Sequence, residues 1–174
     1  MRHEPFYKRG LMKEQTMRFR SAWLVVTFCL LLVLIPRMTL AAESARPVST
    51  IDSAGIEKLI KNKGLTIIVG MAAWCFPCRQ ELPTLIKLYD KFSKEGLNVV
   101  GISVDISGPE AIQPVVDEER VNFPVYWGGE QAVKDLKITR LPMLLFAKDG
   151  AIVDTFVGRQ PEEVLDQRIR DFLK

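Results

Sequence analysis

The order of apolar and polar residues after position 50 switches repeatedly between a helical period and the short apolar runs of strands. Apolar side chains three and four residues apart, opened by a capping residue such as Asp52, predict amphipathic helices. Apolar or alternating runs bounded by glycine predict strands. The predicted helices cover residues 52–64, 76–96, 109–120, 130–137 and 161–172, and the predicted strands cover residues 65–70, 97–104, 123–127, 143–147 and 151–157.

The succession of these elements indicates the fold class. Helix and strand alternate up to residue 142, and two strands joined at Asp149-Gly150 then form a hairpin before a final helix. Pro83 falls inside a predicted helix and should kink it. The order predicts an α/β fold with a central mixed sheet flanked by helices on both faces.

Residues 1–42 have the pattern of an export leader. A basic start is followed by the apolar run Ala22–Ile35 and by small residues ending at Ala42. The leader is a cleaved signal peptide or an uncleaved N-terminal membrane anchor, although its apolar run of 14 residues is short for a span of about 20. Cys29 is interpreted as one more apolar residue of this run.

Either form of the leader exports the remainder of the chain. We therefore expect an extracytoplasmic protein, in the periplasm or on the outer face of the inner membrane. Residues 43–50 are expected to be a polar linker, and residues 51–174 to form one domain. The leader holds seven of the 24 Lys and Arg but only two of the 21 Asp and Glu, so residues 43–174 carry a net charge of −2. This charge argues against a nucleic-acid partner.

The segment Trp74-Cys75-Phe76-Pro77-Cys78 contains the candidate chemistry. It lies where a predicted strand leads into a helix, and a helix N-terminus stabilises a thiolate. Pro77 suits the first turn, where a missing N–H costs nothing. Cys75 is therefore the expected attacking nucleophile, exposed at the helix start. Cys78 is the expected resolving thiol, more buried and with a higher pKa.

The residues available as ligands exclude haem attachment and metal binding, the other uses of a Cys-x-x-Cys spacing. Arg79 stands where haem attachment needs His, and beyond residue 42 the chain has two cysteines and no histidine. No metal or cofactor is therefore expected besides the redox-active dithiol itself. A structural disulfide remains the alternative, although a loop this short stabilises little through chain entropy.

The ordering of elements, the Trp-Cys-x-Pro-Cys motif, Pro83 and a late Leu141-Pro142 before a strand together resemble the thioredoxin fold. Within that superfamily the chain is similar to the exported TlpA/ResA/DsbE thiol–disulfide oxidoreductases, over roughly residues 50–174. That branch has extra secondary structure between the central strands, which corresponds here to residues 107 to about 131. The resemblance implies that Trp74 packs beside the dithiol. It also implies a cis Pro142, whose neighbouring backbone a substrate chain can pair with.

Glu81 is the candidate for proton transfer. It lies three residues beyond Cys78, and ResA-like relatives have an acid at the matching position. Thioredoxin has a buried aspartate in the preceding strand, where this chain has Val69. The alternative for Glu81 is an exposed helix glutamate, and Arg79 is expected to be solvated at the surface.

The sequence thus favours an extracytoplasmic thiol–disulfide oxidoreductase, working as a reductant. By resemblance its partners are apocytochrome c or its maturation factors and a membrane electron donor. A peroxide-reducing enzyme of the same fold is an alternative, but Ala72 stands where that chemistry needs a hydroxyl. A metal chaperone of the Sco type would need wider cysteine spacing and a histidine. A non-enzymatic adaptor would require inert thiols.

Overall fold

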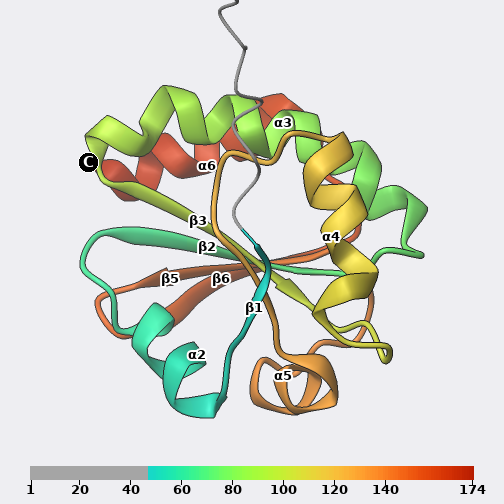
Figure 1. Cartoon of the computed structure of the whole chain (residues 1–174). Helices are drawn as coiled ribbons and strands as arrows, with labels where there is room; N and C mark the ends of the chain where they lie inside the picture. Colours follow the sequence, from blue (N-terminus) through green and yellow to red (C-terminus); the bar gives the residue numbers. More distant parts are fainter. Residues whose placement is uncertain (1–46) are drawn as a thin grey trace, which may run out of the picture. The chain divides into compact units, whose positions relative to one another are not determined.

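The structure is a computed structural model that describes residues 47–174 (Figure 1). The leader, with Cys29 and the predicted signal or anchor, lies outside the described residues. The elements are β1 (Ser49–Thr50), α2 (Ser53–Ile60), β2 (Leu65–Met71), α3 (Phe76–Phe92), the 3₁₀ turn η1 (Ser93–Glu95), β3 (Leu97–Ser103), α4 (Pro109–Glu118), β4 (Val125–Trp127), α5 (Gly129–Asp135), β5 (Met143–Lys148), β6 (Ala151–Val157) and α6 (Glu162–Leu173).

The strands form one mixed sheet in the order β1-β4-β3-β2-β5-β6. The first four strands in this order run parallel, while β5 pairs antiparallel with both β2 and β6. β2 is central and all seven of its residues are buried. The predicted mixed sheet is therefore confirmed.

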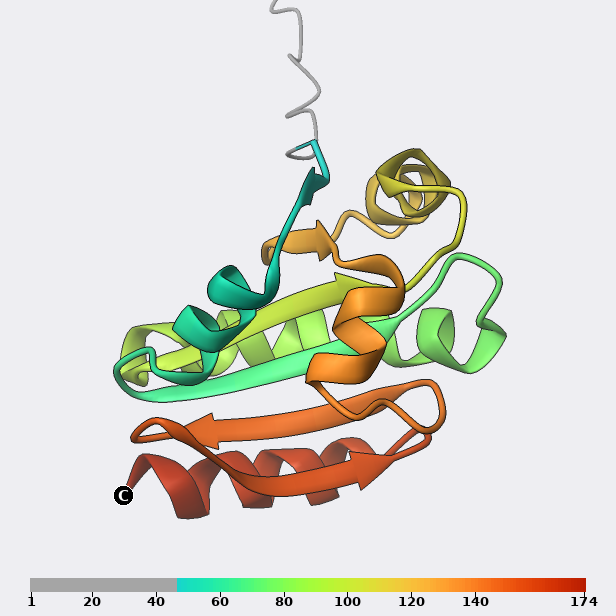
Figure 2. The same cartoon turned by 90° about the horizontal axis from the view of Figure 1, so that it is seen from below.

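Helices cover both faces of the sheet, as predicted. In Figure 2, α2 and α5 lie in front of the sheet, and α3 lies behind it. Alternate residues of β2 point to the two cores, because successive side chains of a strand face opposite ways. Ile67, Val69 and Met71 join the core beneath α3, α4 and α6, and Ile68 joins the core beneath α2 and α5.

Two strands differ from the prediction by more than one residue. β1 lies within residues 43–50, which were expected to be a linker, and it pairs with β4 at the sheet edge. A two-residue strand has no readable period, so its pairing cannot be seen locally. β4 begins at Val125 rather than at residue 123, because Pro124 has no N–H to offer a ladder.

The segment that corresponds to the insert contains one full helix. Residues 107–131 hold α4, β4 and the start of α5. Ile112, Val115 and Val116 of α4 are buried in the core shared with α3 and α6. Within residues 47–174, no helix has the length and apolar character needed to cross a membrane.

Candidate active site

The two cysteines of the motif form a disulfide at the start of α3. Their sulfurs are 2.05 Å apart and their Cα atoms 5.3 Å apart. Cys75 is the N-cap of α3, and the Cys78 N–H donates to its Sγ at 3.2 Å. A sulfur that accepts a hydrogen bond from the first turn of a helix is placed where a thiolate is stabilised. The predicted position of Cys75 at the strand-to-helix junction is confirmed.

The expected exposure of Cys75 is wrong. Cys75 is 3% exposed and Cys78 is 2% exposed, so the two differ little in burial. Both cysteines belong to the buried core cluster that also contains the inward-facing side chains of α3. Trp74 and Phe76 on either side of Cys75 are instead 72% and 68% exposed. The indole of Trp74, expected to pack beside the dithiol, therefore stands largely in solvent.

Asp105 anchors the loop before Cys75, and the sequence did not suggest it. Its buried carboxylate accepts the Ala73 N–H at 3.0 and 3.1 Å and the Ser103 hydroxyl at 2.7 Å. The Trp127 indole N–H donates to the Asp105 carbonyl at 2.6 Å. An available signal was its place two residues after the end of β3, because parallel neighbours end at the same edge of a sheet. Asp105 thus ties the motif loop to the end of β3.

Replacing Asp105 with alanine should lower the free energy of unfolding by about 1–3 kcal/mol, because the partly buried Ala73 N–H and the buried Ser103 hydroxyl both lose the acceptor that the structure gives them. Urea unfolding at neutral pH measures this loss. Asp135, which is exposed and bonded to Gln131 on the same helix, provides the control. Its alanine variant should stay within about 0.5 kcal/mol of the parent.

Glu81 is buried, and its alternative interpretation as an exposed helix glutamate is therefore wrong. It is 1% exposed and follows Cys78 by three residues, which places both on one face of α3. Its Oε1 accepts the Gln160 N–H at 3.0 Å. Nothing among residues 47–174 hydrogen-bonds its Oε2. Burial raises the pKa of Glu81, against the opposing effects of the Gln160 N–H and the charge of Arg159.

This environment predicts a pH-dependent effect of Glu81→Gln on stability. Because the pKa of Glu81 is raised in the folded state, its contribution to the free energy of unfolding is fully present below the unfolded pKa, near 4.5. This contribution is lost as pH rises through the folded pKa. Glutamine cannot ionise and has no such loss. The free energy of unfolding of Glu81→Gln, relative to the parent, should therefore increase as pH rises from about 4 to about 8 in chemical unfolding.

Glu57→Gln gives the opposite sign as a control. Its hydrogen bond to Lys61 holds the pKa of exposed Glu57 below the usual value. The free energy of unfolding of Glu57→Gln, relative to the parent, should therefore decrease with rising pH. Parallel curves for Glu81→Gln and the parent would contradict the burial argument.

Pro142 immediately precedes β5 and lies near the motif loop. The Leu141–Pro142 bond is cis, as the resemblance implied. Met143, the first residue of β5, pairs with Gly70 near the end of β2, so Pro142 lies at the edge of the sheet from which the motif loop emerges. Its carbonyl accepts the Gly158 N–H at 2.8 Å. Val69, in the strand before the motif, is a buried apolar residue of the core.

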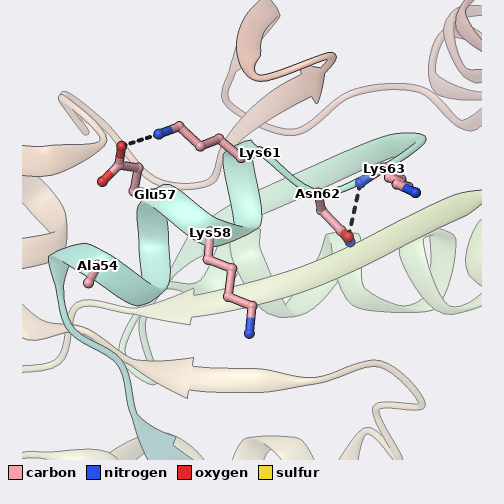
Figure 3. Close-up of a pocket in the computed structure, with 6 residues that line it drawn as sticks. All are labelled: Ala54, Glu57, Lys58, Lys61, Asn62 and Lys63. Carbon is pink, nitrogen blue, oxygen red and sulfur yellow. Dashed lines mark hydrogen bonds and ion pairs between the residues drawn. The ribbon is translucent and has the colours of Figure 1, made fainter.

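Two other candidate groups lie apart from the dithiol. Arg79 directs its guanidinium to Glu118 and Glu119 at the end of α4, at 2.9 and 3.2 Å. The surface hollow of Figure 3, between α2 and the start of β2, is at the opposite end of β2 from Met71. It is lined by three lysines and by Ala54, Glu57 and Asn62, with a Lys61–Glu57 ion pair of 2.5 Å. In the described part of the chain, no three potential metal ligands come together.

The geometry defines a class of protein. A disulfide at the N-terminus of a helix, with a cis proline at the same edge of a mixed sheet, is the arrangement that the resemblance to thioredoxin-fold thiol–disulfide oxidoreductases implied. Residues 35–158 match the model of the AhpC/TSA family, and the chain belongs to that family. Its relatives include thiol–disulfide oxidoreductases named ResA, and the protein is an enzyme of the thiol–disulfide oxidoreductase class.

Individual relatives support this assignment. The chain is 29% identical over 122 residues to the thiol-disulfide oxidoreductase ResA of Bacillus thuringiensis, covering 68% of this chain and 69% of that protein. It is 30% identical over 112 residues to a thioredoxin of Listeria monocytogenes, covering 64% of this chain and 86% of that protein.

Solved structures show the same fold. StoA of Bacillus subtilis superposes with a TM-score of 0.56 at 24% identity, over 62% of this chain and 84% of that one. A thiol:disulfide interchange protein of the thioredoxin family from Chlorobium tepidum gives 0.60 at 21% identity, over 75% and 99%. The predicted similarity to the TlpA/ResA/DsbE-like oxidoreductases is confirmed.

Proposed function

We propose that this oxidoreductase is an extracytoplasmic reductant of protein disulfides, with apocytochrome c or its maturation factors as substrates. The observation that carries the proposal is the Cys75–Cys78 disulfide at the N-terminus of α3, one helical turn from the buried Glu81. The leader pattern of residues 1–42 supports export, as a signal peptide or an anchor. Similarity to ResA-type oxidoreductases supports the substrate class.

The reduction cycle follows from these positions. The Cys75 thiolate attacks one sulfur of the substrate disulfide, forming a mixed disulfide and releasing the other sulfur as a thiolate that takes a proton. Cys78 then loses its proton, which the Glu81 carboxylate accepts, and attacks the Cys75 sulfur. The second substrate sulfur leaves as a thiolate and takes the proton that Glu81 holds, and the Cys75–Cys78 disulfide remains. A membrane dithiol donor returns two electrons and two protons, so the dithiol itself serves as the only redox group.

Exposed apolar side chains on and beside the motif loop suit a polypeptide substrate. Trp74 and Phe76 flank Cys75, and Ile106 is 99% exposed. Ile106 follows Asp105, whose carboxylate holds the Ala73 N–H, so its backbone lies beside the motif loop. Burying these side chains against a substrate chain would favour binding. The backbone next to Pro142 is the proposed pairing site for that chain.

Ile106→Ser should raise KM for a cystine peptide with apolar flanking residues about three- to tenfold, with kcat little changed, because it removes apolar contact area only. Steady-state kinetics with that peptide tests the effect. Val153→Ser is the matched control, since Val153 is also an exposed apolar residue but lies on β6 near the hairpin turn. Equal KM changes in both variants would remove Ile106 from the binding surface.

The decisive experiment for the function is substrate trapping. Cys78→Ala removes the resolving thiol, so a mixed disulfide at Cys75 accumulates in cells and its partner can be identified. Recovery of apocytochrome c or its maturation factors supports the proposal. Recovery of no thiol-linked protein would overturn it. A reduction potential among the strong oxidants would overturn the direction of electron flow alone.

The AhpC/TSA family match favours a second candidate, reduction of a peroxide by the Cys75 thiolate. Ala72 offers no hydroxyl where that chemistry needs one. Stopped-flow measurement of the reduced protein with hydrogen peroxide separates the two functions. Peroxide consumption faster than disulfide exchange would favour the second candidate.

A further inference from the structure

The connection between β6 and α6 contacts two parts of the site at once. The Gln160 N–H donates to Glu81 Oε1 at 3.0 Å, and the Gly158 N–H donates to the Pro142 carbonyl at 2.8 Å. The Gln160 side-chain amide donates to the Gly158 carbonyl at 2.9 Å, which closes the loop on itself. Residues 158–160 of this connection thus link the buried carboxylate of α3 to the cis-proline segment before β5.

We propose that Gly158 and Gln160 are positioning residues of the dithiol site, which hold the Glu81 carboxylate and the Pro142 segment in a fixed relation. The inference rests on the proposed part of Glu81 in proton transfer. Neither residue is placed to react with a substrate disulfide. Both act through the groups that they hold, since their contacts are to Glu81 and Pro142.

Gly158 is needed for its backbone conformation. Its φ of +81° lies in the left-handed region that side chains disfavour, and a Cβ built there would meet no atom within 4 Å. A side chain at position 158 therefore causes no clash, but it opposes the turn that directs the Gly158 N–H to Pro142 and the Gln160 N–H to Glu81. Gly150 in the β5–β6 turn has φ +86° and the same open surroundings. It is a matched position outside the site.

The loop also supplies the groups that oppose the effect of burial on the pKa of Glu81. The Gln160 N–H and the charge of Arg159 both favour the ionised carboxylate, while burial favours the protonated form. Other charges on the elements around it are engaged elsewhere: Arg79 with Glu118 and Glu119, and Lys87 of α3 with Glu162 of α6. When reduced, Cys78 is the titrating group one turn away on the same helix. The loop is thus the source of both effects that favour the ionised form of Glu81.

The test compares Gly158→Ala with Gly150→Ala, and Gln160→Ala with Gln167→Ala, in the full chain. Gln167 is exposed on α6, and its amide bonds to Asp171. The readout is the titration midpoint of the Glu81 side-chain carbon by ¹³C NMR in the oxidised protein, assigned by its absence in Glu81→Gln. Iodoacetamide alkylation of Cys75 in the reduced protein, followed against pH, provides a second readout.

Gly158→Ala and Gln160→Ala should move the Glu81 midpoint upward by about half a unit to one unit, because the N–H bond to the ionised form is weakened. Gly150→Ala and Gln167→Ala should leave it unchanged, although Gly150→Ala loses stability as Gly158→Ala does. Unchanged midpoints in both loop variants, or an equal shift in Gly150→Ala, would overturn the inference. If Gly158→Ala does not fold, Gln160→Ala decides alone.

The same data separate this inference from the proposed function. If Glu81→Gln leaves the pH profile of Cys75 alkylation unchanged while the loop variants shift the Glu81 midpoint, the loop positions the carboxylate but Glu81 has no part in thiol chemistry. If Glu81→Gln changes the profile and the loop variants shift neither readout, the proton-transfer role stands and the positioning role fails.

Discussion

Replacing Cys75 with serine should abolish disulfide reduction, with a fall in kcat/KM of at least about a thousandfold. A serine hydroxyl stays protonated at neutral pH and does not attack a disulfide, whereas the N-terminus of α3 favours the thiolate at this position. The loss should appear in the release of thiols from a cystine peptide. Stability serves as a check that the variant remains folded.

Cys29→Ser is the matched control for this prediction, because Cys29 is the only other cysteine of the sequence and lies outside the catalytic motif, in the predicted leader. It should leave kcat/KM unchanged. Cys78→Ser should differ from both: it retains the first attack but stops after one turnover, with the substrate bound covalently at Cys75. Activity of Cys75→Ser within tenfold of the parent would exclude Cys75 as the nucleophile.

The site is assembled where several strands of the sheet end or begin together. β2 leads into the motif loop, and β3 ends at Ser103, next to the Asp105 that holds that loop. β5 starts immediately after Pro142, and β6 leads to the loop that holds Glu81. In open α/β sheets, functional sites form at the carboxyl ends of the parallel strands. Here the antiparallel strands β5 and β6 bring two further segments to that same edge.

Much of this arrangement could be predicted from local pattern. The runs of β2 and β3 are apolar because both strands are buried, and the helices show the spacing of a single buried face. Cys75 and Cys78 are recognisable because spacing and context identify a dithiol without help from the fold. The cis bond at Pro142 was expected only through resemblance to a family, since local pattern does not report peptide isomers.

The missed features depend on contacts between residues far apart in the chain. Asp105 and Ala73 are separated by 32 residues, and Gln160 and Glu81 by 79. Neither hydrogen bond produces a periodic pattern in the sequence. Glu81 could therefore not be distinguished from an exposed helix residue. The burial of Cys75 was missed for a related reason: capping a helix predicts a position along the chain, not the depth of that helix end within the fold.

Phe146→Ala should give the largest loss of stability, about 3–5 kcal/mol in the free energy of unfolding. Phe146 lies in the middle of β5, is fully buried, and packs against the rings of Phe156 and Phe172 at centroid distances of 5.6 and 5.9 Å. Truncation leaves a cavity between the sheet and α6 that rigid neighbours cannot fill. Urea unfolding with an unchanged m-value measures the loss.

Phe76→Ala provides the control with identical chemistry, because Phe76 is 68% exposed beside Cys75. It should change the free energy of unfolding by no more than about 0.5 kcal/mol. For activity the order should be reversed, with Phe76→Ala the more strongly affected variant. Phe146→Ala should retain the kcat/KM of its folded fraction, whereas Phe76→Ala should raise KM, because Phe76 lies in the proposed binding surface. Equal stability losses in the two variants would show that packing beneath α6 does not dominate the stability of this fold.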